Sequence, residues 1–598
     1  MAEKQPGKWS RMPKMSFSSK DLSRRMKKVE GATVKHARRF VVRRWSSFKD
    51  VRRHIAVWIL AVGLLIGATG LQLFWYQEGH RTIAAANNGT YAEAVQGPVD
   101  TLNPIFARTS AEESLSTLLF SRLLAYDKSG NLNYDLAQNV SLSEDQKTYT
   151  IQLRDDARWT DGLYVGARDV VFTVNLLKNQ STRASISGWN DITVEAVDDR
   201  TVQFTLPAVY AAFPHALNFL PILPEHILRD VEPANLRENK FSTNPVGSGP
   251  FTIRFIQDLD QSEDRKIVYL TRNDTYFKGA PKLERFQLHV YEDSEAIVRA
   301  LNTSEVNAAI DIPLSLTDDV RASRYTVQQT PINNGAYAIF NTGSGPLADR
   351  TVRRALQAGT NTEAVREAVG QNIPALTLPF MRDLVGGELP GGPSYNPERA
   401  AELLVEAGWE LENGVRVNED GEALRISVVT TMNPDFEKVL NALQEQWRGL
   451  GLTVTTSIAD PSDPSQNFVQ NVLRAREYDV LLYQLSIGGD PDVYAYWHSS
   501  QAGDGLNFSD YANINADDAL SSAREVVAKN LRDAKYRTFA RQWLSDAPAL
   551  GLYQVTSQYV YSGTTQVGVS DQRFITPTDR YTDVRYWTVG ERLIQRTP

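Results

Sequence analysis

The longest hydrophobic stretch of the chain lies near its N-terminus, at residues 55–76. Its sequence, IAVWILAVGLLIGATGLQLFWY, contains no charged residue, and Gln72 is its only strongly polar side chain. About 20 apolar residues span a bilayer as an α-helix, because the helix satisfies its backbone polar groups internally. Trp58 and Trp75 lie near the two ends, where aromatic rings favour the membrane interface. The pattern predicts one transmembrane helix, and a buried core helix is the alternative.

Charge is divided unevenly around this helix. Residues 1–53 hold 17 Lys and Arg against four acidic residues, a net charge of +13, whereas the remaining chain has 47 basic and 67 acidic residues. The positive-inside rule places the basic tail in the cytoplasm and residues 77–598 outside. We expect an uncleaved signal anchor, and the alternative is a signal peptide cleaved near Ala84–Ala86. This interpretation is favoured over nucleic-acid binding by the tail, so no nucleic-acid partner is expected.

Periodicity predicts a mixed α/β protein beyond the helix. Strands are expected at residues 91–97 and 149–153, and helices at residues 114–126 and 169–177. Later, the order strand, helix, strand, helix, strand over residues 424–485 predicts a largely parallel sheet covered by helices, with the second helix near residues 466–474. The clearest helix follows Asn396, a good N-cap that precedes proline.

Composition narrows the classes of chemistry. The chain of 598 residues has no cysteine, which excludes disulfides, thiolate metal sites, a Cys nucleophile and a lipid-modified N-terminal Cys. Its 42% hydrophobic and 23% charged residues are ordinary for globular domains. No HExxH, HxH or G-x-S-x-G pattern is present. The sequence therefore predicts neither an enzyme nor a cofactor or metal site.

Six short motifs follow one another from Trp159 to Asn507. They are WTDG with ARDVVF (159–162, 167–172), NPVGSGPF (244–251), NDTYFKGAPKL (273–283), ALNTSEVN (300–307), YNPERAAELLVEAGW (395–409) and DPD…W…S…N (490–507). In this order they resemble the signatures of family 5 solute-binding proteins, which serve oligopeptide, dipeptide, nickel and some sugar importers. The resemblance covers most of the chain outside the membrane helix.

The resemblance implies an α/β fold of the two-lobed periplasmic-binding-protein type (type II), with an extra domain on the first lobe and one preceding transmembrane helix. The expected parts are a basic cytoplasmic tail (1–53), a transmembrane signal anchor (54–77), a linker (78–90), lobe I (91–125, 241–335 and 553–598), its extra domain (126–240) and lobe II (336–552).

The resemblance also implies a function. The protein would be a monomeric extracellular receptor anchored in the cell membrane. It would capture peptides or similar small solutes in the cleft between the lobes and deliver them to the permease subunits of an ABC importer. The alternatives are a sensor or chaperone of the same fold without a transport role and, less favoured, a hydrolase.

Ligand-binding residues follow from matching the family's ligand loops to this chain. They are Arg108, Thr109 and Ser110 after the first strand, Tyr337 and Asn341 at the entry to lobe II, Ser486, Ile487, Gly488, Gly489 and Asp490 in a late strand-turn, and Trp497. Core packing is the alternative role for Tyr337, and capping of the turn around Pro491 is the alternative for Asp490.

One position departs from the family pattern. Oligopeptide binders place an Asp four residues before the Pro of the late motif, where it pairs with the peptide's α-ammonium, whereas this chain has Ile487. A buried ammonium without a partner is costly. Either Asp490 substitutes, or the ligand lacks that ammonium, or the chain is a divergent member; Arg108 could pair with an acidic group of the ligand.

Overall fold

The computed structural model describes Lys35 and residues 48–79, 81–85, 88–260, 265–460 and 467–595. The remainder of the predicted basic tail lies outside these residues. The chain divides into two compact units, residues 1–84 with 592–598 and residues 85–591.

The first unit contains the N-terminal apolar helix, α2 (Phe48–Gly79). Its segment Arg52–Trp75 has a mean hydropathy of 2.0 and no buried part, so by length and composition it can cross a membrane. Within the predicted linker, β1 (Arg81–Ala85) pairs with β22 (Glu591–Gln595) in a two-stranded sheet.

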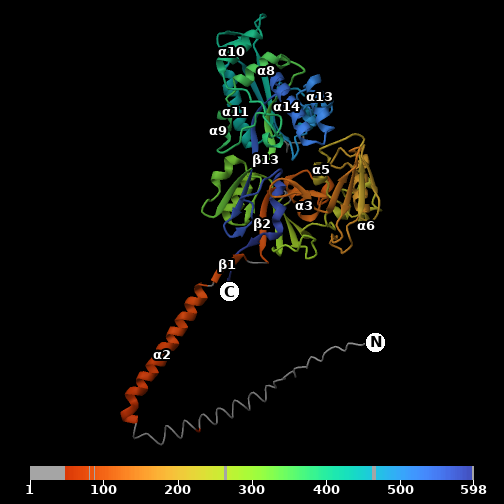
Figure 1. Ribbon diagram of the computed structural model, residues 1–598. Helices are drawn as coiled ribbons and strands as arrows, with labels where there is room; N and C mark the ends of the chain where they lie inside the picture. The colour runs from red at the N-terminus through yellow and green to blue at the C-terminus, as the bar shows by residue number, and fades with distance from the viewer. Residues whose placement is uncertain are drawn as a thin grey trace, which may run out of the picture. The chain divides into compact units, whose positions relative to one another are not determined.

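A ten-stranded mixed sheet is the backbone of the second unit (Figure 1). In spatial order its strands are β17 (Thr453–Ala459), β16 (Arg425–Thr431), β18 (Val480–Ser486), β13 (Tyr325–Phe340), β19 (Ala549–Ser562), β12 (Ala308–Ala309), β2 (Thr90–Gln96), β11 (Arg285–Tyr291), β10 (Arg265–Arg272) and β9 (Phe251–Asp260). We call the part from β12 to β9 lobe I and the part from β17 to β18 lobe II.

Two long antiparallel strands, β13 and β19, run through both lobes. Near lobe I, Thr326 pairs with Tyr561, which also lies against β12, and near lobe II, β13 pairs with β18. The register between β13 and β19 is broken between Pro331 and Gly335. Proline cannot donate a backbone hydrogen bond, and the β13–β19 ladder is interrupted where the strands pass from one lobe to the other.

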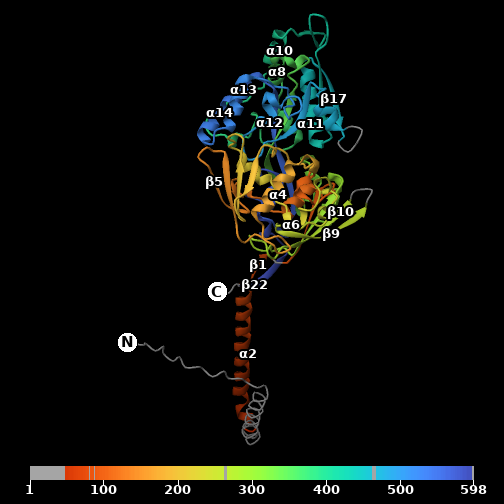
Figure 2. The ribbon, with the colours of Figure 1, turned by 90° about the vertical axis from the view of Figure 1, so that its right-hand side faces the viewer.

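Helices cover lobe II, and both views show them gathered around its strands (Figures 1 and 2). Strands β16, β17 and β18 are parallel neighbours, which confirms the predicted parallel sheet. The covering helices are α8 (Arg350–Ala358), α9 (Thr362–Val369), α10 (Pro397–Glu406), α11 (Pro434–Gly449), α12 (Tyr494–Trp497), α13 (Ile514–Arg524) and α14 (Lys529–Asp546).

Lobe I carries α3 (Ser110–Leu119), α7 (Ser294–Thr303) and the 3-10 segment η13 (Pro577–Tyr586). Between β2 and β9 the chain forms a separate four-stranded sheet, which we call the extra sheet, and we call residues 137–228, which contain it, the extra-sheet segment. Its strands, with the helices of the same segment, are β5 (Ala137–Leu142), β6 (Thr148–Leu153), β8 (Thr201–Thr205), β7 (Thr193–Ala196), α4 (Ala167–Lys178), α5 (Phe213–Ala216) and α6 (Glu225–Leu228).

Three two-stranded sheets complete the second unit. They are β3 (Leu124–Tyr126) with β4 (Leu132–Tyr134), β14 (Glu410–Glu412) with β15 (Val415–Val417), and β20 (Thr565–Gln566) with β21 (Thr588–Val589).

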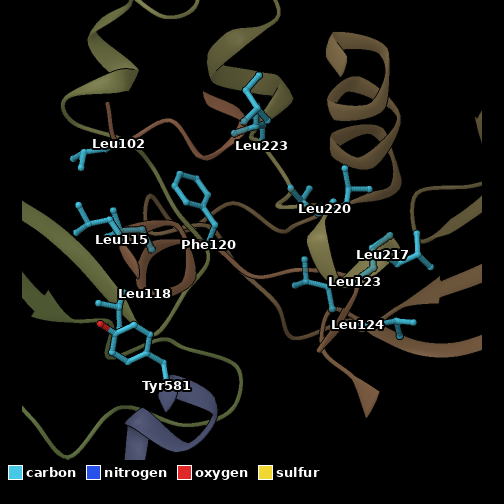
Figure 3. Close-up of a cluster of buried hydrophobic side chains, with 14 of the residues drawn as sticks. Leu102, Leu115, Leu118, Phe120, Leu123, Leu124, Leu217, Leu220, Leu223 and Tyr581 are labelled. Carbon is cyan, nitrogen blue, oxygen red and sulfur yellow. The ribbon is translucent and has the colours of Figure 1, made fainter. Parts of the chain in front are cut away.

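One hydrophobic cluster joins lobe I to the extra-sheet segment. Figure 3 shows Leu115 and Phe120 of the α3 region together with Leu217, Leu220 and Leu223 of the extra-sheet segment, all of them buried. Because the two parts share apolar side chains rather than polar surfaces, the extra sheet is held as part of lobe I.

Two predicted helices differ in the structure. The helix expected over residues 114–126 is α3, which begins at a Thr109 cap and ends at Leu119. Phe120 is extended and packs against Phe241, and Leu124–Tyr126 forms β3. The helix expected near residues 466–474 is a short π-helix at Val469–Arg474, and Gln466 lies outside the described residues.

A buried ion pair ties three segments of lobe I together. Glu93 of β2 and Arg580 of η13 are both fully buried, and the guanidinium donates two hydrogen bonds to one carboxylate oxygen, at 2.8 and 3.1 Å. Tyr559 of β19 donates to the other oxygen at 2.9 Å, and Tyr581 donates to the first. The carboxylate of β2 is thus satisfied by two segments distant from it in sequence, β19 and η13.

We expect Glu93→Gln to lower the free energy of unfolding by about 3–5 kcal/mol, because the variant leaves Arg580 buried without a counter-charge. Urea unfolding of the full chain in detergent, followed by tryptophan fluorescence, measures the loss. As the matched control, Glu402→Gln removes a carboxylate from an exposed pair with Arg399 and should change stability little. Equal effects of the two variants would contradict a structural role for the buried pair.

Candidate functional site

A cavity of about 520 Å³ lies between the two lobes, beside the break in the long strands. Such a volume suits a small ligand. Lobe I, with the extra-sheet segment, provides most of the wall, and residues at the junction with lobe II, Asn334 and Ser486, close it. The polar and charged lining residues of lobe I and the extra-sheet segment are Arg108, Ser110, Glu113, Ser116, Arg122, Ser185, Asp311, Thr576 and Thr578.

The first predicted ligand loop reaches this cavity. Arg108 lies in the wall, where its Nε donates to the Ser185 hydroxyl at 3.0 Å, and Ser110 lies beside it as the first residue of α3. Thr109 has a different task. Its hydroxyl donates to the Pro98 carbonyl at 2.7 Å and accepts from the backbone of Glu112, in a capping box that fixes the start of α3.

The late strand-turn also reaches the cavity, through Ser486 at the end of β18. Next along the chain, the Ile487 amide donates to the Asn333 carbonyl at 2.9 Å, and the Asn333 side chain donates to the Gly488 carbonyl at 2.7 Å. Because Asn333 lies in the register break, these bonds fasten the turn to the crossing strand. A Cβ atom at Gly489 would overlap the ring and hydroxyl of the buried Tyr126, so this close approach favours glycine.

Asp490 is turned away from the cavity into an ion pair. Its carboxylate is buried and receives two hydrogen bonds from the Arg532 guanidinium of α14. Asp492 likewise meets Arg524 of α13, with 3.1 Å between Nε and Oδ2. Burial raises the pKa of Asp492, and Arg524 opposes that rise. Both acids of the motif are therefore neutralised within the protein.

Three of the predicted ligand residues lie in the core instead. Tyr337 is fully buried, and its hydroxyl donates to the Leu378 carbonyl at 3.0 Å. Its ring meets the buried Trp497 edge to face, with 6.0 Å between centroids. Asn341 is buried and donates to the Tyr478 carbonyl at 3.1 Å. None of the three lines the cavity. Tyr337 and Asn341 donate to backbone carbonyls and Trp497 packs against the Tyr337 ring, so the structure favours packing roles.

Several cavity residues carry no sequence motif of their own. Asp311 follows the short strand β12, Asn334 sits in the break of β13, and Thr576 and Thr578 flank the start of η13. No local pattern distinguishes such residues from surface polar residues. Among the residues that the structure describes, no group of three His, Cys, Asp or Glu side chains could hold a metal ion.

Apart from the cavity, lobe II also contacts the extra-sheet segment directly, through Arg524. The Arg524 guanidinium lies between two tyrosine rings, 4.5 Å from the Tyr210 centroid and 4.4 Å from the Tyr494 centroid. Its backbone carbonyl accepts from the Ala211 amide at 2.9 Å. Tyr210 and Ala211 belong to the extra-sheet segment and Tyr494 to lobe II, so one arginine bridges the two parts.

A histidine lies at the same junction. The Nδ1 atom of His215 is 2.9 Å from the Tyr126 hydroxyl, and its Nε2 atom is 3.8 Å from the Asp490 carboxylate. Burial lowers the pKa of His215, and the Asp490 charge opposes that shift. At this junction His215 therefore lies between Tyr126 of β3 and Asp490 of the late motif.

The fold and the cavity define the class: a two-lobed α/β binding protein of the periplasmic-binding-protein type. Residues 131–505 match the model of the bacterial extracellular solute-binding proteins, family 5. The chain therefore belongs to this family, which confirms the predicted family and fold. It is an extracytoplasmic solute-binding protein, not an enzyme, and carries one N-terminal apolar helix.

Known relatives agree over most of their length. The oligopeptide-binding protein AppA of Bacillus subtilis is 26% identical over 469 residues, covering 75% of this chain and 83% of AppA. The dipeptide-binding protein of Escherichia coli is 26% identical over 505 residues, covering 78% of this chain and 90% of the relative.

Solved structures match the fold closely. The structure of B. subtilis AppA in complex with a nonapeptide has a TM-score of 0.71 at 22% identity and covers 85% of this chain and 100% of that one. The ABC transporter substrate-binding protein CtaP of Listeria monocytogenes has a TM-score of 0.73 at 24% identity and covers 84% of this chain and 99% of that one.

We expect Arg524→Ala to loosen the bridge between lobe II and the extra-sheet segment, because it removes both ring contacts and the partner of Asp492. Since the chain has no cysteine, spin labels at Glu195→Cys and Asp518→Cys report one distance by pulsed electron resonance. The variant should show a broader distribution with a longer mean. Arg524→Lys keeps the charge but not the planar stack, and should lie between. Unchanged distributions in both variants would contradict the bridge.

Proposed function

We propose that the protein is the substrate-binding receptor of an ABC importer and captures peptides in the cavity between its lobes. The observation that carries the proposal is this polar cavity of about 520 Å³, walled by both lobes, in a chain of a solute-binding family. The relatives named for oligopeptide and dipeptide binding support peptides as the ligand class. CtaP, named as an ABC transporter protein, supports permease subunits as the partner.

Closure of the lobes would bury the ligand. The break between Pro331 and Gly335 supplies a place where the long strands can bend, as hinge closure requires. Asn333 links this hinge to the turn at Ile487 and Gly488, so bending moves Ser486 with it. The proposed domain boundary at 335/336 falls beside this break, and the other boundaries predicted from the sequence are retained as part of the proposal.

Within this function, the proposed ligand contacts are the predicted residues that line the cavity: Arg108, Ser110 and Ser486. Thr109, Ile487, Gly488 and Gly489 hold the two loops in place through their backbone contacts and the cap. The hydroxyl-rich wall can bond to peptide backbone directly or through water, which suits ligands of varied side chain.

We expect the full chain, purified in detergent, to release peptides on denaturation or to gain thermal stability with peptide pools. A ligand at 100 times its Kd stabilises the folded state by about 2.7 kcal/mol, which a melting experiment resolves. Peptides bound by the protein would be identified by mass spectrometry. A protein stabilised only by metal chelates or oligosaccharides would contradict the peptide assignment while keeping the receptor class.

We further propose that α2 is an uncleaved signal anchor, with the tail inside and the receptor outside, acting as a monomer. Its apolar segment is longer than a signal-peptide core, and a tail of 53 residues precedes the helix region. Mass spectrometry of the protein from the membrane fraction should therefore find tail peptides. Cleavage near Ala84–Ala86, with loss of the tail, would contradict the anchor.

A further inference from the structure

The charges of the cavity are all on one side. Of its lining residues, those at the junction with lobe II, Asn334 and Ser486, are neutral. Lobe I contributes two arginines and two carboxylates, Arg108, Arg122, Glu113 and Asp311. A charged ligand therefore has to be recognised from lobe I.

The acids of the late motif cannot serve instead. Asp490 is held by Arg532 and Asp492 by Arg524, as described above. Releasing either carboxylate to a ligand would leave a partly buried arginine without its partner, which is costly. The Ile487 side chain at the remaining motif position is buried and apolar.

Asp311 is the carboxylate best placed for this task. Its backbone is left-handed, with φ of 63°, and its carbonyl accepts from the Ser294 hydroxyl at 3.0 Å, which holds the loop after β12. Its Oδ2 atom accepts from the Gln96 amide at 3.3 Å. Burial raises the pKa of Asp311, and a hydrogen bond from Ser110 opposes that rise.

No described Lys, Arg or His forms an ion pair with Asp311. The nearby Arg580 is already bonded to Glu93. A partly buried carboxylate that lacks a counter-charge is stabilised by a cation that enters its cavity. Glu113 is a second carboxylate on the same wall. Burial raises its pKa, and the charge of Arg122, which also lines the cavity, opposes that rise.

We propose that Asp311 binds the α-ammonium of the peptide ligand, so that the free N-terminus is recognised from lobe I rather than from the late motif of lobe II. The assignment rests on the proposed function. It explains how a chain with Ile487 at the motif position can still take peptides with a free amine. Asp311 is then a residue that determines specificity.

The experiment compares a pool of tetrapeptides with the same pool after N-acetylation, on the full chain in detergent, by calorimetry. Wild type should prefer the free amines. Asp311→Asn should weaken their binding by about 10- to 100-fold, the loss typical of a hydrogen bond to a charged group, and leave the acetylated pool nearly unchanged. Asparagine tolerates the left-handed backbone, so the variant suits the loop.

Asp318→Asn is the matched control, because it removes a charge from an exposed residue of the following segment that does not line the cavity. It should bind both pools as wild type does. Asp311→Glu, which keeps the charge, should retain the preference for free amines and guards against a folding defect in the first variant.

If Asp311→Asn loses affinity equally for both pools, or loses none, the assignment of Asp311 is wrong. Binding of peptides by wild type would in that case still support the proposed receptor function. Absence of peptide binding by wild type would instead overturn the proposed function, and the assignment with it.

Discussion

The pairing of β13 with β19 is the constraint on which the rest of the structure depends. These strands are the central neighbours of a sheet that continues from one lobe into the other, so neither lobe has a complete sheet without them. The same pairing is interrupted where the lobes meet, around Pro331. The cavity lies beside this interruption, where Asn334 of β13 and Ser486 of β18, which pair with each other at the end of their ladder, both line it.

Arginine–carboxylate contacts connect segments of the chain that the ten-stranded sheet does not join. Arg580 fixes the C-terminal segment to β2 inside lobe I, and Arg532 and Arg524 fix the late motif to α14 and α13. The acids of this family motif therefore have a structural role, because they pair with arginines of helices that follow later in the chain. The ligand cavity is consequently left to the charges of lobe I.

Much of the fold could be predicted from local patterns. The α10 helix begins at its Asn396 cap, and the parallel strands of lobe II follow the alternation of strand and helix. The end of α3 could not be predicted, because apolar spacing continues past Leu119 while Phe120 leaves the helix to pack on Phe241. Helical periodicity does not report such a tertiary contact.

The site was harder to predict than the fold. Matching to the family's ligand loops placed Arg108, Ser110 and Ser486 at the cavity, but Tyr337 and Trp497, predicted in the same way, pack in the core. Asp311 has no motif, because its position in the cavity results from contacts with residues more than 200 positions earlier, such as the Gln96 amide. The alternative role for Asp490, capping of the turn, is confirmed by the Asp492 amide, which donates to Asp490 Oδ1 at 3.0 Å. Its ion pair with Arg532, 42 residues away, could not be predicted, because no local pattern links the two residues.

The tyrosine-flanked Arg524 has a consequence for the surroundings in which the protein works. Dissolved ions screen exposed charges beyond about 10 Å at 0.1 M salt, but they act weakly on a partly buried pair in direct contact. Arg524 meets Asp492 and two aromatic faces at short range. The junction between lobe II and the extra sheet should therefore hold with little change as the ionic strength outside the cell rises and falls.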